Sequence, residues 1–198
     1  MKRYAPATAR NREPIREVLA RHLPARGLVL EIASGTGEHA VHMAGSLPAL
    51  RWQPTDLDPA SLESIAAWQA EAGLPNLLPP LALDVTAPAW PVTAADAIVC
   101  INMVHISPWE AALALFAGAA RTLPPAGVLY LYGPYRFDGA TAPSNEAFDR
   151  SLRERDPRWG VRDLRDLRAA AEDRGLALAH VVAMPANNHS LVFVRGAG

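Results

Sequence analysis

A glycine-containing segment near the N-terminus has the residue types of a nucleotide-binding loop. The stretch VLEIASGTGEHAVHMA, residues 29–44, passes from an apolar run through a carboxylate into a loop with two glycines. Gly35, Gly37 and Ala40 satisfy the dinucleotide pattern G-x-G-x-x-G/A. Glycines here let the backbone approach a ligand closely. The loop could hold a dinucleotide for hydride transfer or S-adenosylmethionine for methyl transfer, and the absence of Gly-Lys-Ser/Thr excludes a phosphate-binding P-loop.

Carboxylates around this loop distinguish between the two ligands. Glu31 lies four residues before Gly35, where a carboxylate would repel a pyrophosphate but would suit a ligand that carries a sulfonium and an ammonium. Asp56 and Asp58 follow the second apolar segment, and a carboxylate about 20 residues past the glycine loop typically accepts both ribose hydroxyls. The run DLDP resembles a methyltransferase pattern in which the first acid binds ribose, which implies that role for Asp56. We expect Asp58 to cap the helix that begins at Pro59.

Polar residues also follow the third and fourth apolar segments. Asp84 ends the run LALDV, where we expect it to bind the ligand rather than only to form a turn. Asn102 should lie close to the same ligand through its backbone. His105 is the histidine best placed for proton transfer, and two roles stay open for it: a catalytic base, or a neutral histidine hydrogen-bonded at the end of a strand.

A second group of polar and aromatic residues is predicted to form a cup for a small polar acceptor. Tyr135 is expected to act in catalysis with His105, and Arg136 either pairs with an acceptor carboxylate or stays solvated. Asn187 and Asn188 either face the acceptor or serve a turn, since asparagine tolerates left-handed backbone conformations. The residues expected to contact the acceptor are Arg12, Tyr132, Arg136, Asn145, Asn187 and Asn188.

Alternating apolar and amphipathic segments must position these residues. Strands are predicted at 28–32, 50–55, 78–85, 96–102, 127–133, 176–184 and 190–196. Helices are predicted at 11–23, with Asn11 as cap, after Gly37, and at 59–73, 107–123 and 161–175. The alternation indicates a doubly wound α/β sheet of seven strands, mostly parallel, with helices on both faces.

The end of the chain departs from this alternation. The link PANNH between the last two strands is too short for a parallel crossover, which needs a dozen or more residues. These strands must form an antiparallel hairpin, an ending typical of S-adenosylmethionine-dependent methyltransferases and normally absent from dehydrogenase domains. We expect a single domain over 1–198, with an N-terminal helical cap at about 1–26 and an unstructured inserted lid at about 134–160.

Motifs spread along the chain resemble one family of class I methyltransferases. The segments RNREPI, LEIASGTGEHA, WQPTDLD, CINMVHISPWEA, LYGPYR, SNEAFD, DPRWGVRDL and MPANNHSLVF occur in this order over roughly residues 8–195. They are similar to the poorly characterised family whose animal members are called methyltransferase-like protein 26. The resemblance implies a Rossmann-like fold and S-adenosylmethionine as cofactor, but it supplies no substrate.

The resemblance also implies roles for individual residues. Motif I of class I methyltransferases is usually E/D-x-G-x-G-x-G, and Ala33 stands here in place of the first glycine. Asp84 would accept a hydrogen bond from the adenine amino group, with Val85 beside the ring. The residues expected to bind the cofactor are Glu31, Ala33, Ser34, Gly35, Gly37, Asp56, Leu57, Asp84, Val85 and Asn102.

Composition and missing motifs narrow the function. A formal net charge of -1 gives no strong field for nucleic acid or a membrane surface. The single cysteine, Cys100, lies in an apolar run and is expected to be buried. His39, His42 and His189 are interpreted as surface or structural residues, so no metal is expected. The chain has neither the NPPY motif after the fourth strand nor a Pro-Cys pair, which favours a small-molecule acceptor over a nucleobase.

Two alternatives stay open beside a methyltransferase. The first is an NAD-dependent oxidoreductase, which the glycine pattern alone supports. The second is a protein that binds S-adenosylmethionine without catalysis and regulates a partner. With neither a signal peptide nor a membrane-spanning apolar stretch, we expect a cytoplasmic protein. The sequence does not indicate an oligomeric state.

Overall fold

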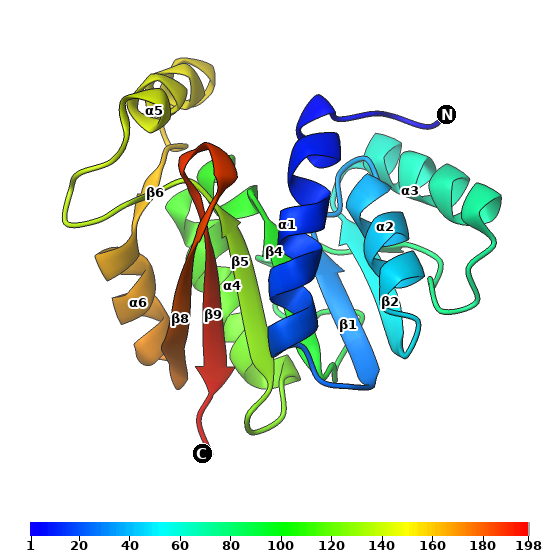
Figure 1. The fold of residues 1–198 in the computed structure, drawn as a ribbon. Coiled ribbons are helices and arrows are strands. Elements are labelled where there is room, and N and C mark those ends of the chain that lie inside the picture. Colours follow the sequence, from blue (N-terminus) through cyan, green and yellow to red (C-terminus); the bar gives the residue numbers. More distant parts are fainter. Residues whose placement is uncertain (198) are drawn as a thin grey trace.

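Seven strands form the central sheet. They are β1 (Gly27–Ile32), β2 (Leu50–Asp56), β3 (Leu81–Ala82), β4 (Ala97–Ile101), β5 (Val128–Gly133), β8 (Leu176–Met184) and β9 (Asn188–Arg195). The computed structural model describes residues 1–197 and places these strands in the order β3-β2-β1-β4-β5-β9-β8 (Figure 1). Strand β9 runs antiparallel to both β5 and β8, whereas the pairs from β3 to β5 are parallel. The predicted fold class is therefore confirmed.

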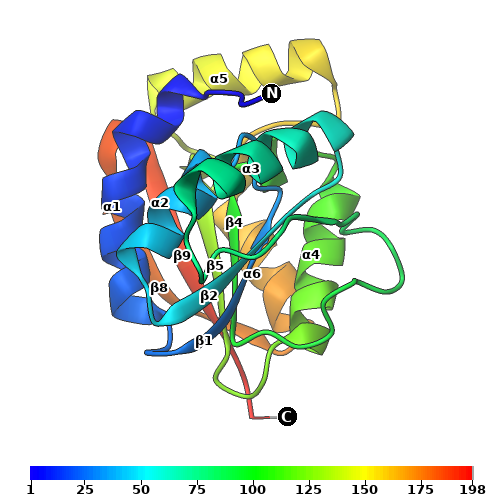
Figure 2. The ribbon, with the colours of Figure 1, turned by 90° about the vertical axis from the view of Figure 1, so that its right-hand side faces the viewer.

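Helices cover both faces of the sheet. They are α1 (Pro6–His22), α2 (Glu38–Ser46), α3 (Pro59–Ala72), α4 (Trp109–Thr122), α5 (Pro143–Arg155) and α6 (Leu164–Glu172). In Figures 1 and 2, α1 and α2 lie on one face, α4 and α6 on the other, and α5 lies beyond the edge where the parallel strands end. In the part of the chain that the structure describes, no helix is both long and apolar enough to cross a membrane.

Two apolar cores follow from the alternation of side chains along each strand. Leu129 and Leu131 of β5 are buried on the side of α4 and α6, and Tyr130 is buried on the side of α1 and α2. Successive side chains of a strand point to opposite faces, so a strand covered on both faces is apolar at every position. The same alternation decides to which face each polar side chain at a strand end belongs.

The strand order places the ends of β1, β2 and β4 at one edge of the sheet. Strand β1 pairs with β2 on one side and with β4 on the other, so the order reverses at β1. Open α/β sheets bind ligands outside the carboxyl ends of their strands at such a reversal. The segments at the ends of these three strands, together with the turn after β3, carry the residues that the sequence predicts to bind a cofactor.

The N-terminal helix begins earlier than predicted. Helix α1 starts at Pro6, five residues before Asn11, and Asn11 is not its cap. Proline suits the first helical turn because it has no N–H to leave unsatisfied and its φ is already helical. The Asn11 carboxamide instead meets His39 Nε2 of α2, with 2.9 Å between Oδ1 and Nε2. This contact ties the N-terminal helix to the helix of the glycine loop.

The segment predicted as an unstructured lid, 134–160, contains a helix. Helix α5 lies within it, and the short strands β6 (Tyr135–Arg136) and β7 (Arg162–Asp163) pair at its two ends. The buried residues of α5 are Asn145, Asp149 and Leu152. Because two of these three are polar, the helix has no apolar stripe, and the periodicity that normally predicts a helix is missing.

The third strand is shorter than predicted. The expected strand at 78–85 is reduced to Leu81–Ala82. Pro79 and Pro80 precede it, and a proline cannot donate an N–H to a neighbouring strand. Because β3 ends at Ala82, the chain turns at Asp84, which lines the same cleft as the loop that follows β1.

Candidate functional site

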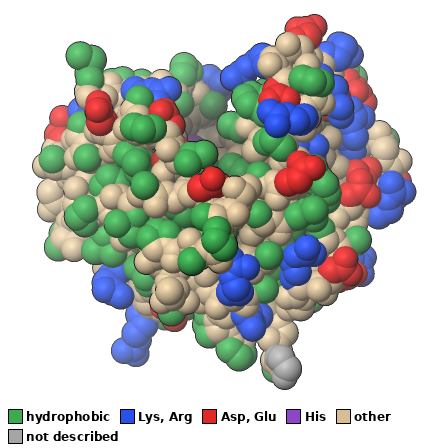
Figure 3. Space-filling model, turned by 180° about the vertical axis from the view of Figure 1, so that it is seen from behind, with side chains coloured by type: hydrophobic (Ala, Val, Ile, Leu, Met, Phe, Trp, Pro, Cys, Tyr) green, Lys and Arg blue, Asp and Glu red, His purple; other side chains and the backbone are tan. Residues whose placement is uncertain are grey.

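A cleft of about 510 Å³ lies at the carboxyl edge of the sheet. This edge is at the top of Figure 3, where the surface is hollowed between hydrophobic side chains. Six of the ten residues predicted to bind a cofactor line the cleft, namely Ala33, Gly35, Asp56, Leu57, Asp84 and Val85. They come from the loops after β1, β2 and β3, so the strand order brings together residues that are distant in sequence.

The glycine loop has an unusual backbone in which each glycine has its own function. Gly35 has φ +59°, and an added Cβ would meet no atom within 4 Å. Its N–H donates to Asp56 Oδ2 at 2.8 Å, so it faces the cleft. Gly37 has φ +92°, and a Cβ there would lie 2.9 Å from Cα of Ile65 in α3. Gly37 is therefore required for packing of two helices, whereas Gly35 leaves space for a ligand.

Ala33 adopts a left-handed conformation at the position of the missing glycine. Its φ is 55°, a region that an L-residue with a Cβ enters at a cost of about 1–2 kcal/mol. Replacement by glycine relieves this strain but adds about 0.4–1 kcal/mol of conformational entropy to the unfolded chain. We expect Ala33→Gly to raise the free energy of unfolding by about 0.5 kcal/mol in urea denaturation.

Ala126→Gly is the matched control for this prediction. Ala126 has φ 64° and lies in the turn before β5, outside the cleft. Both variants should gain similar stability, and a loss of stability in Ala33→Gly alone would show that its methyl group is needed for packing.

Asp56 and Asp58 have different surroundings at the end of β2, and Asp58 is the helix cap that the sequence predicted. Asp56 lines the cleft, and its carboxylate accepts N–H bonds from Gly35 at 2.8 Å and from Asp58 at 2.9 Å. Asp58 is the N-cap of α3, where its carboxylate accepts from the N–H groups of Ala60 and Ser61, both at 3.2 Å. These N–H bonds, together with the Ser61 hydroxyl, hold the pKa of Asp58 below its usual value.

Apolar side chains form the walls of the cleft. Leu57 is 64% exposed and Ile106 is 42% exposed, although large aliphatic side chains normally avoid water. Val85 and Asp84 also line the cleft. The Asp84 carboxylate stabilises the turn that follows β3 by accepting hydrogen bonds from the Thr86 N–H at 2.8 Å and from the Thr86 hydroxyl at 2.7 Å. The cleft therefore combines an apolar slot with carboxylates at its rim.

Glu31 is not brought to the cleft. Its carboxylate is buried and accepts a hydrogen bond from the indole Nε1 of Trp52 at 2.7 Å, on the side of α1 and α2. Burial raises its pKa to about 7, while the bond from Trp52 opposes this rise. Ser34 is also buried, where its hydroxyl oxygen accepts from the Thr55 N–H at 3.2 Å. Both residues shape the loop from inside the fold.

Asn102 ends β4 in a left-handed conformation, with φ 64°. Its N–H donates to the Tyr132 carbonyl at 2.8 Å, and it starts a short 3₁₀ turn, η1 (Met103–His105). Met103 and Ile106 line the cleft, whereas Asn102 does not. Asparagine tolerates this conformation better than most residues, which explains the residue type without a ligand.

His105 and Tyr135 are brought together but are buried. His105 is 0% exposed, Tyr135 is 1% exposed, and their ring centroids are 4.9 Å apart with edge-to-face geometry. Burial and the nearby charge of Arg162 lower the pKa of His105 to about 3, and burial raises the pKa of Tyr135 far above 10. Neither residue lines the cleft. In this structure, therefore, neither His105 nor Tyr135 is positioned as a base at the cleft surface.

Most of the predicted acceptor residues contact other parts of the chain. Arg136 makes a two-pronged ion pair with Glu146, with N···O distances of 2.6 and 2.7 Å, so its partner lies within the chain and differs from both alternatives expected for it. Asn145 donates to the Asn187 carbonyl at 3.0 Å, and Asn188 donates to the Pro185 carbonyl at 3.1 Å. The turn η2 (Pro185–Asn187) is therefore held by these asparagines, as in the structural alternative.

Two further predicted residues lie away from the cleft. Arg12 is exposed on α1, and Tyr132 is buried under that helix. Burial raises the pKa of Tyr132. The RNREPI segment therefore forms part of α1 and does not reach the cleft.

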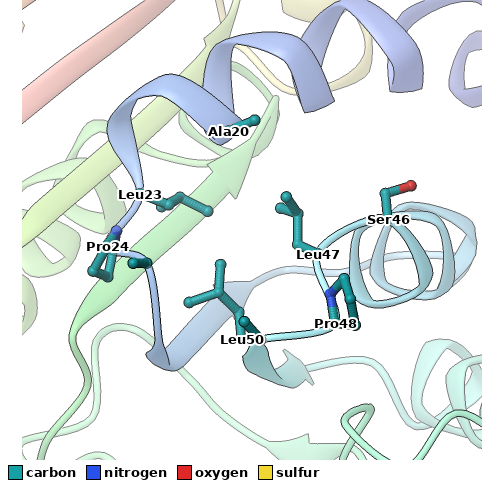
Figure 4. A pocket seen from close by; sticks show the side chains of 9 residues that line it. Ala20, Leu23, Pro24, Ser46, Leu47, Pro48 and Leu50 are labelled. Carbon is teal, nitrogen blue, oxygen red and sulfur yellow. The ribbon is translucent and has the colours of Figure 1, made fainter.

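Sequence reasoning missed the apolar half of the cleft. Met103, Ile106 and Pro108 line it after β4, and Ile32, Leu83 and Ala111 add further apolar surface. Aliphatic residues show no chemistry in a sequence, but their place after a strand that ends beside the glycine loop could have indicated them. A smaller apolar cavity of about 220 Å³ lies at the opposite edge of the sheet, between the end of α1 and the turn before β2 (Figure 4). It contains none of the predicted ligand residues.

The fold is that of solved methyltransferases. An O-methyltransferase family protein from Burkholderia thailandensis matches with TM-score 0.82 and 19% identity, over 97% of this chain and 58% of that chain. An O-methyltransferase family 2 protein from Planctomyces limnophilus, in complex with apigenin, matches with TM-score 0.78 and 20% identity, over 96% and 60%. A methyltransferase of calicheamicin biosynthesis in its SAH-bound form matches with TM-score 0.70 and 19% identity, over 92% and 54%.

The chain thus spans little more than half the length of these three proteins. At such identities the likeness concerns the fold, including its antiparallel last strand. In addition, the family model described as "Protein of unknown function (DUF938)" matches residues 2–195.

Proposed function

This chain belongs to DUF938, a family of proteins of unknown function, and we propose that it is an S-adenosylmethionine-dependent methyltransferase that acts on a small polar acceptor. The observation that carries the proposal is the position of Asp56. Two backbone N–H groups hold its carboxylate at the rim of a cleft whose walls are apolar, at the reversal of strand order. A nucleoside needs this combination, since ribose hydroxyls donate to a carboxylate and a base ring prefers an apolar slot.

The cleft residues fit the cofactor in chemical type. Asp56 would bind the ribose, Leu57, Val85 and Ile106 would enclose the adenine, and Asp84 at the rim would accept from its amino group. The open space above Gly35 leaves room for the backbone to approach the ligand. The residues that act indirectly, Glu31 and Ser34, would hold the loop in shape.

The bound cofactor supplies a methyl group on a sulfonium. Asp56, Leu57, Val85 and Ile106 would hold this cofactor, which would give its methyl group to a lone pair of the acceptor and remain as a neutral thioether. The chain mainly has to align the two reactants and exclude water, and such alignment can lower a barrier by ~7–11 kcal/mol. The solved apigenin complex of a structural neighbour supports a small-molecule acceptor. The motif resemblance also supports our proposal that the chain is related to methyltransferase-like protein 26.

Calorimetry with S-adenosylmethionine and with NAD tests the proposal. We expect S-adenosylmethionine to bind and NAD not to bind. Gly35→Ala should weaken the affinity at least tenfold, because its methyl group projects into the space where we place the cofactor. Binding of NAD instead of S-adenosylmethionine would support an oxidoreductase.

Gly73→Ala is the matched control. Gly73 also has φ +59° and an open Cβ position, but it lies at the C-cap of α3 outside the cleft. Both variants carry the same backbone strain, so a lower cofactor affinity in Gly35→Ala alone would be due to contact between the added methyl group and the cofactor. Equal affinities in the two variants would contradict the cleft assignment. Binding of the cofactor without transfer of a radiolabelled methyl group to any member of a metabolite pool would indicate a non-catalytic binding protein.

A further inference from the structure

Three buried polar atoms near the ends of β4 and β5 lack a hydrogen-bond partner among residues 1–197. They are His105 Nε2, Tyr135 Oη and His189 Nδ1. Buried polar groups are paired in the large majority of cases, so three orphaned atoms in one region need an explanation. None of the three residues lines the cofactor cleft.

The three side chains lie on one face of the sheet. A Cβ on Gly133 would collide with His105 Nε2, so His105 lies against the face to which that Cβ points. His189 is directly opposite Gly133 in the antiparallel pair of β5 and β9, and residues directly opposite each other project to the same face. The Tyr135 ring packs edge-to-face on His105, with 4.9 Å between centroids. The orphaned atoms thus share the side of α4 and α6.

This cluster adjoins the cofactor cleft. The turn η1 separates the two, since Met103 and Ile106 line the cleft while His105 is fully buried behind them. A group bound at the cluster would lie next to the cleft, at the end of β4. That is where an acceptor must be if the cleft holds a methyl donor.

The charges around the cluster favour an uncharged ligand. Two arginines of the segment 134–160 are already paired: Arg136 with Glu146, and Arg153 with Asp149 at 2.8 Å. The Arg162 guanidinium donates to the carbonyls of Val104 at 2.9 Å and Ser107 at 2.6 Å. Burial lowers the pKa of both histidines and raises that of Tyr135, so all three side chains are neutral at pH 7. An anionic group would therefore lose its hydration and would meet only cationic side chains whose hydrogen bonds are already made within the chain.

We propose that His105, Tyr135 and His189 form a subsite that binds an uncharged hydroxyl group of the acceptor. This inference rests on the proposed function. The segment after α5 covers the subsite, because the Gly160 N–H donates to the His105 carbonyl at 3.0 Å and the Arg162 N–H approaches His105 Nδ1 at 3.4 Å. The acceptor enters when this segment moves, and its hydroxyl then provides the partner that the three side chains lack.

Histidine-ring NMR with phenol and benzoate as probes tests the subsite. These probes have similar rings, but at pH 7 phenol has an uncharged hydroxyl and benzoate a carboxylate. The ring ¹⁵N signals of His105 and His189 should shift saturably with phenol and stay unchanged with benzoate. Tyr135→Phe should weaken the phenol affinity at least fivefold while raising the Tm, because it removes an unpaired buried hydroxyl. No shift with phenol, or an equal response to benzoate, would overturn the proposal.

Tyr130→Phe is the matched control, because Tyr130 lies on β5 and is buried on the opposite face of the sheet. The Tyr130 hydroxyl is paired with Ser190 Oγ at 2.6 Å. Its removal should lower the Tm and leave phenol affinity unchanged, and an equal loss of phenol affinity in both variants would also overturn the subsite. The titrations are run with and without S-adenosylhomocysteine, whose binding is measured by calorimetry. Failure of S-adenosylhomocysteine to bind would contradict the proposed function, while the phenol titration without it still decides on the subsite.

Discussion

Replacement of Glu31 by glutamine is expected to remove a pH-dependent loss of stability that we expect of the natural protein between about pH 4.5 and pH 7. The buried carboxyl has its pKa raised from 4.5 to about 7, first by desolvation and also by the charge of Asp56. The folded protein therefore keeps this proton at pH values where the unfolded chain has lost it. Stability from this group is complete below the unfolded pKa and declines as the pH rises towards 7.

The gap between these two pKa values corresponds to about 3 kcal/mol, a large share of a typical domain's stability. Glutamine keeps a carbonyl oxygen for the Trp52 indole and carries no charge at any pH. Urea unfolding of both proteins at pH 5 and pH 8 measures the effect. We expect the stability of Glu31→Gln relative to the natural protein to rise by about 2.5 kcal/mol between these pH values, because at pH 5 the unfolded chain has already lost most of this proton.

Because Glu31→Gln is compared with the natural protein at each pH, the contributions of all other titratable groups to the free energy of unfolding cancel. His39, His42 and His189 also have lowered pKa values because of burial, but they are present in both proteins. A constant difference between the two proteins over this range would show that Glu31 titrates normally and that the carboxyl is not held in a dry site.

The second large effect is expected at Asp56. Its carboxylate would accept both ribose hydroxyls, and hydrogen bonds to a charged group contribute roughly 1.5–3 kcal/mol. Asp56→Ala should weaken S-adenosylmethionine binding at least tenfold, since ~1.4 kcal/mol corresponds to one decade in affinity. Asp56→Asn should have a smaller effect because it keeps an oxygen for the Gly35 N–H. Calorimetry with the cofactor measures both variants.

Asp58→Ala separates binding from folding at this loop. Asp58 caps α3 and pairs with Arg3 at 3.1 Å, outside the residues that line the cleft. Its replacement should lower the Tm and leave the affinity closer to that of the natural protein. A greater loss of binding in Asp58→Ala than in Asp56→Ala would mean that Asp58 is the residue that faces the ribose.

The sequence alone determined the architecture and the place of the cleft. Apolar segments of strand length alternate with helices, an order that indicates a mostly parallel sheet covered by helices on both faces. The five-residue link PANNH is too short for a crossover, so the antiparallel last strand followed from chain geometry. The spacing of Gly35 and Asp56 placed both at the same edge of the sheet, because consecutive parallel strands end there.

Only the tertiary structure decided which polar side chains face the cleft. Glu31 is directed away from it because its partner is Trp52, 21 residues later, and Asn145 is held by Asn187, 42 residues later. Arg136 is paired with Glu146 on α5. This helix was not predicted, because its buried residues are mostly polar and give no apolar periodicity. A sequence shows where a polar group stands along the chain. Whether another part of the same chain already satisfies that group depends on contacts between segments that the fold alone brings together.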